Sequence, residues 1–256
     1  MDTVLYDQYV MERYKNGLTG RGSQTKNPEI KIDKPSFAKK AFNLPRISQL
    51  NKEHLARKYL EDRKIPEEYF RDLYFCENFK EWTNTQKHTF DKVDKDEPRI
   101  IIPLINEGKI IGFQGRSLQK KSKIKYITIM LEEDAPKIYG LDRIKKGDRI
   151  YVTEGPFDST FIRNSIALCG ADGDIGKWVT GDTVWIYDNE PRNREIVSRI
   201  ERTINNGARV VIWPKDIQEK DINDMFLSGL NVQSVVESNI FSGLEAKLKF
   251  NTWKKV

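Results

Sequence analysis

From Asp148 onward, short apolar runs alternate with amphipathic segments, and this alternation limits the possible folds more than any other feature of the chain. Four apolar runs are expected to form strands: 149–153, 165–168, 183–187 and 208–213. Helices are expected between them at 157–163, 191–206 and 221–228, and Gly207 fits the position just past the second of these helices. Apolar strands separated by amphipathic helices predict an α/β, doubly wound and mainly parallel sheet.

The region before Asp148 has a different period. The runs RIIIPLI and KIIGFQG, separated by Asn106-Glu107-Gly108, predict a β-hairpin, and a third strand is expected at 124–130. Helices are expected from Asn51 and after Pro66. This pattern predicts a mixed α+β lobe. The chain is therefore divided into four predicted parts: a polar linker or arm at 1–45, the α+β lobe at 46–146, the doubly wound domain at 147–230, and a carboxy-terminal helix and tail at 231–256.

Composition excludes some classes of protein and favours others. The 256 residues carry a formal net charge of +6, and a basic balance favours a polyanionic partner such as nucleic acid. No apolar run approaches the roughly 20 residues needed to cross a bilayer, so we expect no membrane partner and a cytoplasmic location. The two cysteines, Cys76 and Cys169, lie far apart and cannot build a four-ligand zinc ribbon.

Acidic residues follow three of the predicted strands in pairs: Glu154 and Asp158, Asp188 and Glu190, and Asp221 and Asp224. The carboxyl ends of parallel strands meet at one edge of a sheet, so these side chains are expected to converge. Crowded carboxylates repel one another and need cations, and hard oxygen ligands favour Mg²⁺ or Mn²⁺. Taken singly, each acid could equally be a helix cap, a dipole partner or part of a turn. Together, and in this order, they predict a metal site.

At these residues the sequence resembles a known family. EGPFD, DNE and KDIND are similar to the motifs of the TOPRIM domain, which primases, topoisomerases and some nucleases share. The preceding RIIIPLINEGKIIGFQGRSL resembles the strand pair ahead of TOPRIM in bacterial and phage DNA primases. The resemblance covers roughly residues 48 to 230. The form KDINDMFLSG and the compact length resemble the separate primases of T-even-like phages, which implies a bacterial host cytoplasm.

The resemblance implies a fold, a reaction and a set of roles. The fold would be an α+β lobe followed by a TOPRIM sheet, and the reaction Mg²⁺-dependent synthesis of short RNA primers on single-stranded DNA. Asp188 and Glu190 would hold the metal with the help of Asp158, Asp221 and Asp224, while Glu154 would act as a base or as an organiser of the metal site. Contacts to nucleic acid or nucleotide would come from four basic residues: Arg116, Arg99, Lys125 and Lys220.

The implied partners are a single-stranded DNA template, ribonucleoside triphosphates and a replicative helicase. Two departures from the family pattern stand out. The cysteines for the usual zinc ribbon are missing from this sequence, and the usual DxD reads Asp188-Asn189-Glu190. Two alternatives stay open on the sequence: a TOPRIM nuclease, and a non-catalytic module that binds single strands or docks onto a helicase. The GFQGR segment argues against the first, and the nearly complete set of acids argues against the second.

Overall fold

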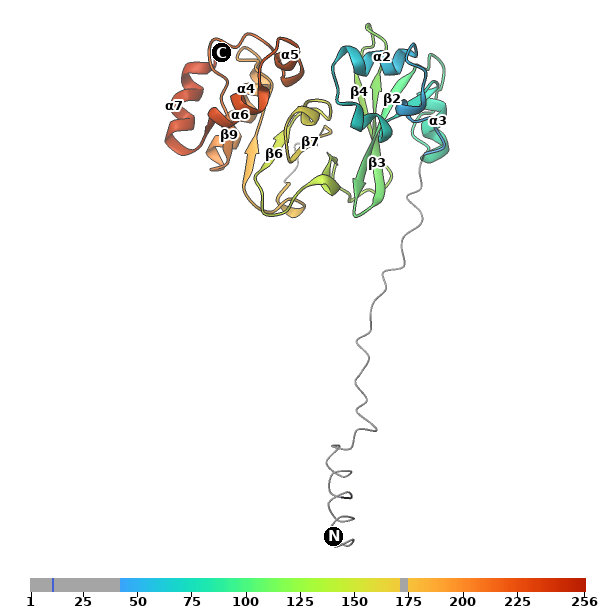
Figure 1. Ribbon diagram of the computed structural model, residues 1–256, viewed down its shortest axis with the longest axis horizontal. Helices are drawn as coiled ribbons and strands as arrows, with labels where there is room; N and C mark the ends of the chain where they lie inside the picture. The colour runs from blue at the N-terminus through green and yellow to red at the C-terminus, as the bar shows by residue number, and fades with distance from the viewer. Residues whose placement is uncertain (1–10, 12–41, 171–174) are drawn as a thin grey trace, which may run out of the picture. The chain divides into compact units, whose positions relative to one another are not determined.

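The computed structural model describes residue 11, residues 42–170 and residues 175–256. Lys39–Val256 form one compact unit, whose strands gather into two sheets (Figure 1). The predicted arm at 1–45 lies almost entirely outside the described residues. One sheet is antiparallel and the other is mainly parallel, so the prediction of an α+β lobe followed by a doubly wound sheet is confirmed.

The first sheet consists of four antiparallel strands in the order β1 (Tyr74–Cys76), β2 (Arg99–Asn106), β3 (Lys109–Ser117) and β4 (Tyr126–Met130). The predicted hairpin joins β2 to β3, with Asn106 paired to Lys109. Glu107 and Gly108 form its two-residue loop with φ angles of 51° and 75°. Positive φ at both loop positions matches the right-handed twist of the flanking strands.

Helices cover both faces of this sheet. They are η1 (Ile47–Gln49), α2 (Leu55–Asp62), η2 (Glu67–Arg71) and α3 (Phe79–Gln86). Ile100 and Ile102 of β2 share a core cluster with Leu60 of α2, whereas Ile101 packs with Phe79 of α3 in a separate cluster. Burial on both faces is why β2 reads as a continuous apolar run rather than an alternating one.

The two helices predicted in this lobe differ from the observed ones, one in its start and the other in its type. The helix expected from Asn51 begins at Leu55, because Nδ1 of His54 accepts a hydrogen bond from the Ala56 N–H at 3.2 Å and caps the helix. Asn51 instead accepts from the N–H of Glu53 in the preceding turn. The segment after Pro66 forms the 3₁₀ helix η2.

The second sheet has the order β10-β9-β8-β6-β7-β5. Its strands are β5 (Ile138–Tyr139), β6 (Ile150–Thr153), β7 (Ser165–Leu168), β8 (Thr183–Trp185), β9 (Arg209–Val211) and β10 (Ile240–Phe241). The four central strands are parallel, and the edge strands β5 and β10 are antiparallel to their neighbours. Because β6 lies between β7 and β8, strand order reverses there, and such a switch point is where open α/β sheets bind ligands.

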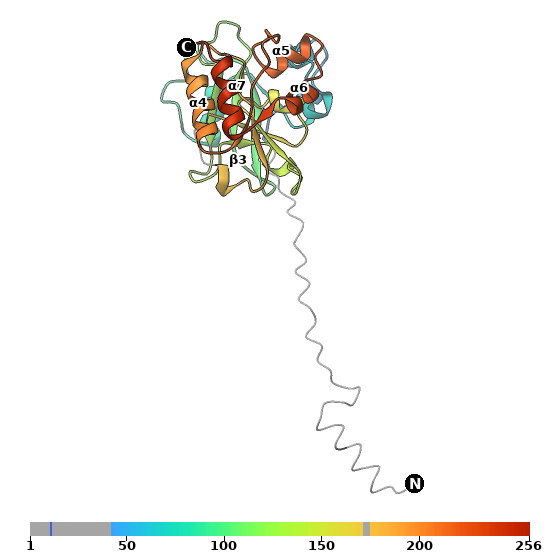
Figure 2. The ribbon, with the colours of Figure 1, turned by 90° about the vertical axis from the view of Figure 1, so that its left-hand side faces the viewer.

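Helices α4 (Arg194–Asn205) and α7 (Gly243–Trp253) lie side by side against β9 (Figures 1 and 2). The expected apolar stripe of α4 is buried, but the helix begins at Arg194 rather than Pro191 because the Asn193 side chain caps it. Further helices of this half are η3 (Leu141–Arg143), η5 (Ile175–Lys177), α5 (Ile222–Leu227) and α6 (Val232–Ser238). None of the described helices is long and apolar enough to span a membrane.

The helix expected at 157–163 is a single 3₁₀ turn, η4 (Asp158–Phe161). Hydroxyls of Ser159 and Thr160 donate to backbone carbonyls three residues back, which competes with a regular helix. The predicted ranges of the three folded parts stay predictions. The second sheet also takes in β5 and β10, which lie outside 147–230.

The two sheets share apolar packing. One core cluster contains Ile100 and Ile102 of β2 together with Tyr139 of β5 and Ala167 of β7. The Thr128 hydroxyl of β4 donates to the carbonyl of Cys169, just beyond β7, at 2.9 Å. The carboxyl ends of the second sheet are therefore held against the first sheet, and four of the predicted acids lie along this junction.

Candidate active site

Four of the predicted acids line one cavity of about 260 Å³ at the junction of the two sheets. Glu154 follows β6, Asp158 opens η4, Asp188 follows the β8 segment and Asp221 caps α5. Basic side chains line the same cavity: Arg63, Arg116, Lys125 and Lys220. A cavity in which carboxylates face cationic side chains can bind a cation and a polyanion together.

Asp158 lies close to the glycine of the EGPFD motif. A Cβ atom on Gly155 would lie 2.6 Å from Oδ2 of Asp158, so a larger residue at position 155 would make this carboxylate shift. The N–H of Asn223 donates to Oδ1 of Asp158 at 3.3 Å. Burial, helped by the Asp221 carboxylate, raises the pKa of Asp158 to about 7.

Asp188 has the more strongly perturbed carboxyl group. Burial, together with repulsion from Glu154, Asp158 and Asp221, raises its pKa to about 8. The Lys220 ammonium opposes that shift but does not cancel it. Perturbed carboxyl groups in a cleft are typical of catalytic and metal-binding sites.

Glu154 is held by two partners. Its Oε1 pairs with Nη1 of Arg199 at 2.7 Å, and its Oε2 accepts from the backbone N–H of Asp188 at 3.1 Å. Arg199 comes from α4, so one carboxylate ties the end of β6 both to that helix and to the segment after β8. Nothing in the sequence pointed to Arg199, because it lies in an ordinary charged stretch of an amphipathic helix.

Glu190 and Asp224, although described by the structure, are not among the residues that line the cavity. The Glu190 N–H donates to the carbonyl of Asp188 at 2.9 Å, which turns the backbone instead of extending it. Oε1 of Glu190 lies 3.3 Å from Nζ of Lys220. Asp224 is exposed in the first turn of α5, where its N–H donates to Asp221.

Arg116 lies against two aromatic rings. Its guanidinium carbon is 4.6 Å from the centroid of Tyr126 and 5.6 Å from that of Tyr59. Its Nε is buried without a hydrogen-bond partner among the described residues. Stacking on the two rings holds the guanidinium group of Arg116 in place, and Arg116 still lines the cavity. A guanidinium group held in this way is suited to binding phosphate.

Arg99 corrects the prediction of a nucleic-acid contact. The residue is 2% exposed, and its guanidinium donates to the carbonyls of Gly115 and Ile124, both at 2.8 Å. It also pairs with Glu97. Nη1 and Nη2 donate inside the protein, whereas Nε is buried without a partner among the described residues. Arg99 therefore organises the loop before β4, and it is not among the residues that line the cavity.

Arg63 and Asn223 belong to the candidate site, although the sequence did not point to either residue. Nη1 of Arg63 donates to Oδ1 of Asn223 at 2.8 Å, and Nδ2 of Asn223 donates to the carbonyl of Arg63 at 2.7 Å. Asn223 is 1% exposed, and it follows Asp221 in the KDIND segment. The reciprocal bonds join the end of α2 to α5, across the cavity.

The donor chemistry of the site suits a hard cation. Its acids are carboxylates whose pKa values rise because they crowd together, and a bound divalent cation would relieve that repulsion. Across the described part of the chain, however, no three histidine, cysteine or acidic side chains are arranged so that they could hold a metal ion. The residues therefore fit a metal in type, and their side chains would have to move to form its coordination sphere.

Comparison with solved structures defines the class of protein. A DnaG catalytic core matches with a TM-score of 0.60 at 20% identity, over 80% of this chain and 78% of that one. The RNA polymerase domain of Mycobacterium tuberculosis primase DnaG, in complex with a double-stranded DNA oligomer with a 6-nucleotide overhang, matches with a TM-score of 0.56 at 16% identity, over 78% of this chain and 77% of that one. The fold is thus that of a TOPRIM-containing primase catalytic core.

Sequence comparison then gives the family. No family model matches the chain. The DNA primase of Enterobacteria phage T4 is 36% identical over 259 residues, spanning 98% of this chain and 75% of that protein. The chain belongs to this DNA primase family. The predictions of a primase fold and of a nucleotidyltransferase that makes RNA primers are confirmed.

Proposed function

We propose that the cavity at the junction of the two sheets is the catalytic site of this primase, where ribonucleotides are joined on single-stranded DNA in the presence of Mg²⁺. One observation carries the proposal: four carboxylates from separate segments face basic side chains within a single cavity. In the reaction, a 3′-hydroxyl forms a bond to the α-phosphorus of the incoming nucleotide and pyrophosphate leaves.

Asp188, Asp158 and Asp221 are the residues we expect to hold Mg²⁺, with Glu190 and Asp224 joining through side-chain rotation. Carboxylate oxygens are preferred ligands of Mg²⁺ and Mn²⁺. When bound, the metal supplies positive charge that offsets the charge of the triphosphate. The raised pKa values of Asp158 and Asp188 support this role, because each carboxyl group is destabilised as an anion until a cation arrives.

The basic residues of the cavity are proposed to bind the phosphates. Arg116, held by two rings, is the first candidate, and Lys125, Lys220 and Arg63 line the same cavity. A guanidinium fork suits two phosphate oxygens, whereas a lysine acts as a mobile point charge. These side chains would position the triphosphate and the template rather than take part in covalent chemistry.

Glu154 is best explained as the organiser of the site. Its carboxylate is already engaged by Arg199 and by the backbone of Asp188, so it fixes the segment that carries the metal-binding acid. A role as the base that accepts the hydroxyl proton would require release from Arg199. We therefore propose Glu154 as a positioning residue first.

The proposed partners are a single-stranded DNA template, ribonucleoside triphosphates and a replicative helicase, in a cytoplasmic setting. The relative from M. tuberculosis is a DNA complex, which supports a nucleic-acid template for this chain. A TOPRIM nuclease would share the acids but would not need basic side chains that bind a nucleotide. A non-catalytic binder would not need perturbed carboxyl groups, so both alternatives are weaker.

Primer synthesis with labelled ribonucleotides on single-stranded DNA, in Mg²⁺, tests the proposal. Asp188→Asn should lower product formation at least 100-fold, because it removes a charged metal ligand. Asp148→Asn, an exposed acid ahead of β6, is the matched control and should keep full activity. A helicase is added in a parallel reaction. Asp188-dependent nicking of the template would favour the nuclease, and unchanged synthesis by Asp188→Asn would overturn the site.

A further inference from the structure

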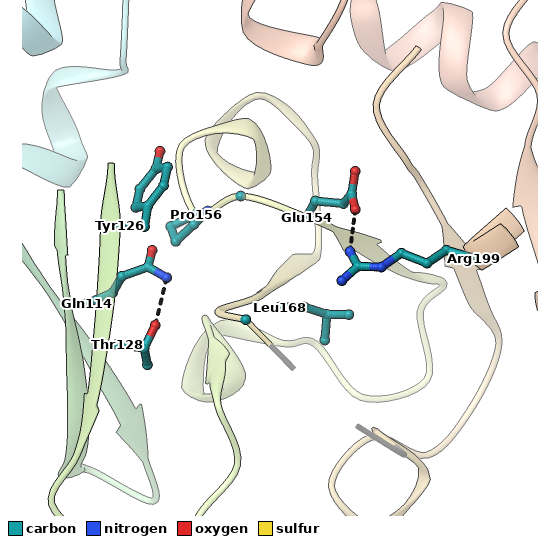
Figure 3. A pocket seen from close by; sticks show the side chains of 9 residues that line it. Gln114, Tyr126, Thr128, Glu154, Pro156, Leu168 and Arg199 are labelled. Atoms are coloured by element: carbon teal, nitrogen blue, oxygen red, sulfur yellow. Dashed lines mark hydrogen bonds and ion pairs between the residues drawn. The ribbon is translucent and has the colours of Figure 1, made fainter. Parts of the chain in front are cut away.

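A second cavity of about 270 Å³ adjoins the carboxylate cavity (Figure 3). The two share Tyr126, Glu154 and Gly155 as lining residues, so they are neighbouring compartments along one junction. The second cavity is lined on one side by Gln114 and Thr128 of the first sheet. Pro156 and the Glu154–Arg199 ion pair line the other side. The proposed function does not use this compartment.

The amide of Gln114 has only one orientation that fits its hydrogen bonds. The Thr128 hydroxyl gives its single hydrogen to the carbonyl of Cys169 at 2.9 Å. It can therefore only accept from Gln114, and Nε2 of Gln114 lies 3.0 Å from the hydroxyl oxygen. The two successive hydrogen bonds, from Gln114 to Thr128 and from Thr128 to Cys169, thus fix which atom of the amide is the oxygen.

That oxygen, Oε1 of Gln114, is buried and has no hydrogen-bond partner within the described part of the chain. Gln114 is only 4% exposed, and it lines the second cavity. Figure 3 shows Oε1 on the side of the amide that faces away from Thr128. Buried acceptors are nearly always satisfied in folded proteins, so one left open at a cavity wall indicates a ligand that donates.

We propose that Gln114 is a specificity-determining residue, whose amide oxygen accepts a hydrogen bond from the 2′-hydroxyl of the incoming ribonucleotide. The inference rests on the proposed function, because it takes the phosphates to lie in the carboxylate cavity. The sugar is bonded directly to the α-phosphate, so it must occupy a compartment next to the phosphates. A deoxyribonucleotide has no 2′-hydroxyl and would leave Oε1 unsatisfied, which is the basis for discrimination.

The test compares ATP, 2′-deoxy-ATP and 2′-fluoro-2′-deoxy-ATP in extension of a short RNA primer. Gln114→Met keeps the length of the side chain and removes the acceptor. We expect it to lower kcat/KM for ATP about tenfold and leave kcat/KM for both analogues unchanged. Fluorine cannot donate a hydrogen bond, so wild-type protein should treat the 2′-fluoro analogue like the deoxy compound.

Thr83→Val is the matched control. Thr83 on α3 also carries a buried hydroxyl without a partner among the described residues, but it does not line either cavity. Thr83→Val should leave the kcat/KM values for ATP and for both analogues unchanged. Thermal unfolding of both variants checks that they fold.

Equilibrium binding of ATP and 2′-deoxy-ATP, measured by calorimetry with Mg²⁺, separates this inference from the proposed function. Tighter binding of ATP that depends on Gln114 would support the inference even if no primer were made. An unchanged preference for ATP in Gln114→Met would overturn it. So would a change in preference among the four bases with sugar discrimination intact, because Gln114 would then contact the base.

Discussion

Asp188 lies where burial and three neighbouring carboxylates act on one side chain. The resulting pKa of about 8 means that the folded, metal-free protein retains a proton that the unfolded chain, with an Asp pKa near 3.9, has already released. Stability falls with rising pH wherever the unfolded state binds fewer protons. The carboxyl group at position 188 therefore destabilises the metal-free fold progressively between about pH 4 and pH 8.

This gives a stability prediction for Asp188→Asn, the variant that we also expect to lose activity. With a chelator present, Asp188→Asn should raise the free energy of unfolding at pH 8 by about 1–3 kcal/mol, and by much less at pH 5, because asparagine stays neutral. Urea unfolding at the two pH values measures the difference. Asp148→Asn should show no such dependence on pH. An equal effect of Asp188→Asn at both pH values would contradict the assigned cause.

At the scale of elements, strand β3 carries two residues that line the cavities and a glycine that packs against a helix. It carries Gln114 and Arg116 on either side of Gly115, and Gly115 packs directly against the ring of Phe79 on α3. A Cβ atom at position 115 would lie 2.4 Å from Cε2 of Phe79. The second glycine of GFQGR, Gly115, is thus explained by packing between the strand and the helix rather than by contact with a ligand.

Gly115→Ala should therefore displace Phe79 or the strand. Overpacking of this kind costs about 1–3 kcal/mol of unfolding free energy. Because β3 also carries Arg116, we expect primer synthesis to fall at temperatures where the variant remains folded. The control is Gly108→Ala in the hairpin loop, where the space is open but φ is 75°. Gly108→Ala should lower the free energy of unfolding by about 1 kcal/mol and should retain primer synthesis. Urea titration and primer assays give both quantities.

At the scale of the whole molecule, the junction between the sheets depends on a few polar links besides the shared apolar core. Asn223 alone bonds the side chain of Arg63, the backbone of Arg63 and the carboxylate of Asp158. Its side chain thus connects the α2 region to the helix that follows the third acidic motif. We expect this link to fix the width of the active-site cavity.

Asn223→Ala should lower the free energy of unfolding by about 1–3 kcal/mol, because it leaves partly buried groups of Arg63 without partners. Primer synthesis should also fall, since Arg63, which lines the cavity, loses the side chain that holds it. Arg63→Met and the double variant complete a cycle, for which we expect a coupling free energy of at least about 0.5 kcal/mol. Strictly additive effects would show that the two residues act independently. Asn231→Ala, which removes the cap of α6, is a matched control for loss of an asparagine.

Much of the fold was readable in the sequence because its signals are local. The apolar spacing of Ile196, Val197, Ile200 and Ile204 marks one buried face of α4, and the paired runs around Glu107-Gly108 mark a hairpin. Four of the six predicted acids share a cavity because parallel strands end at one edge of a sheet. Periodicity and strand ends are properties of short segments, so a single chain is enough to predict them.

The sequence by itself thus determined the strand and helix pattern, the position of the acids and the resemblance to primases. Only the tertiary structure decided that Arg99 is buried, that Glu190 pairs with Lys220, and that Arg63 meets Asn223. The last two residues are 160 positions apart, and their contact leaves no periodic trace in the chain. The physical reason is that burial and charge pairing depend on which surfaces meet, and that is settled when the two sheets pack together.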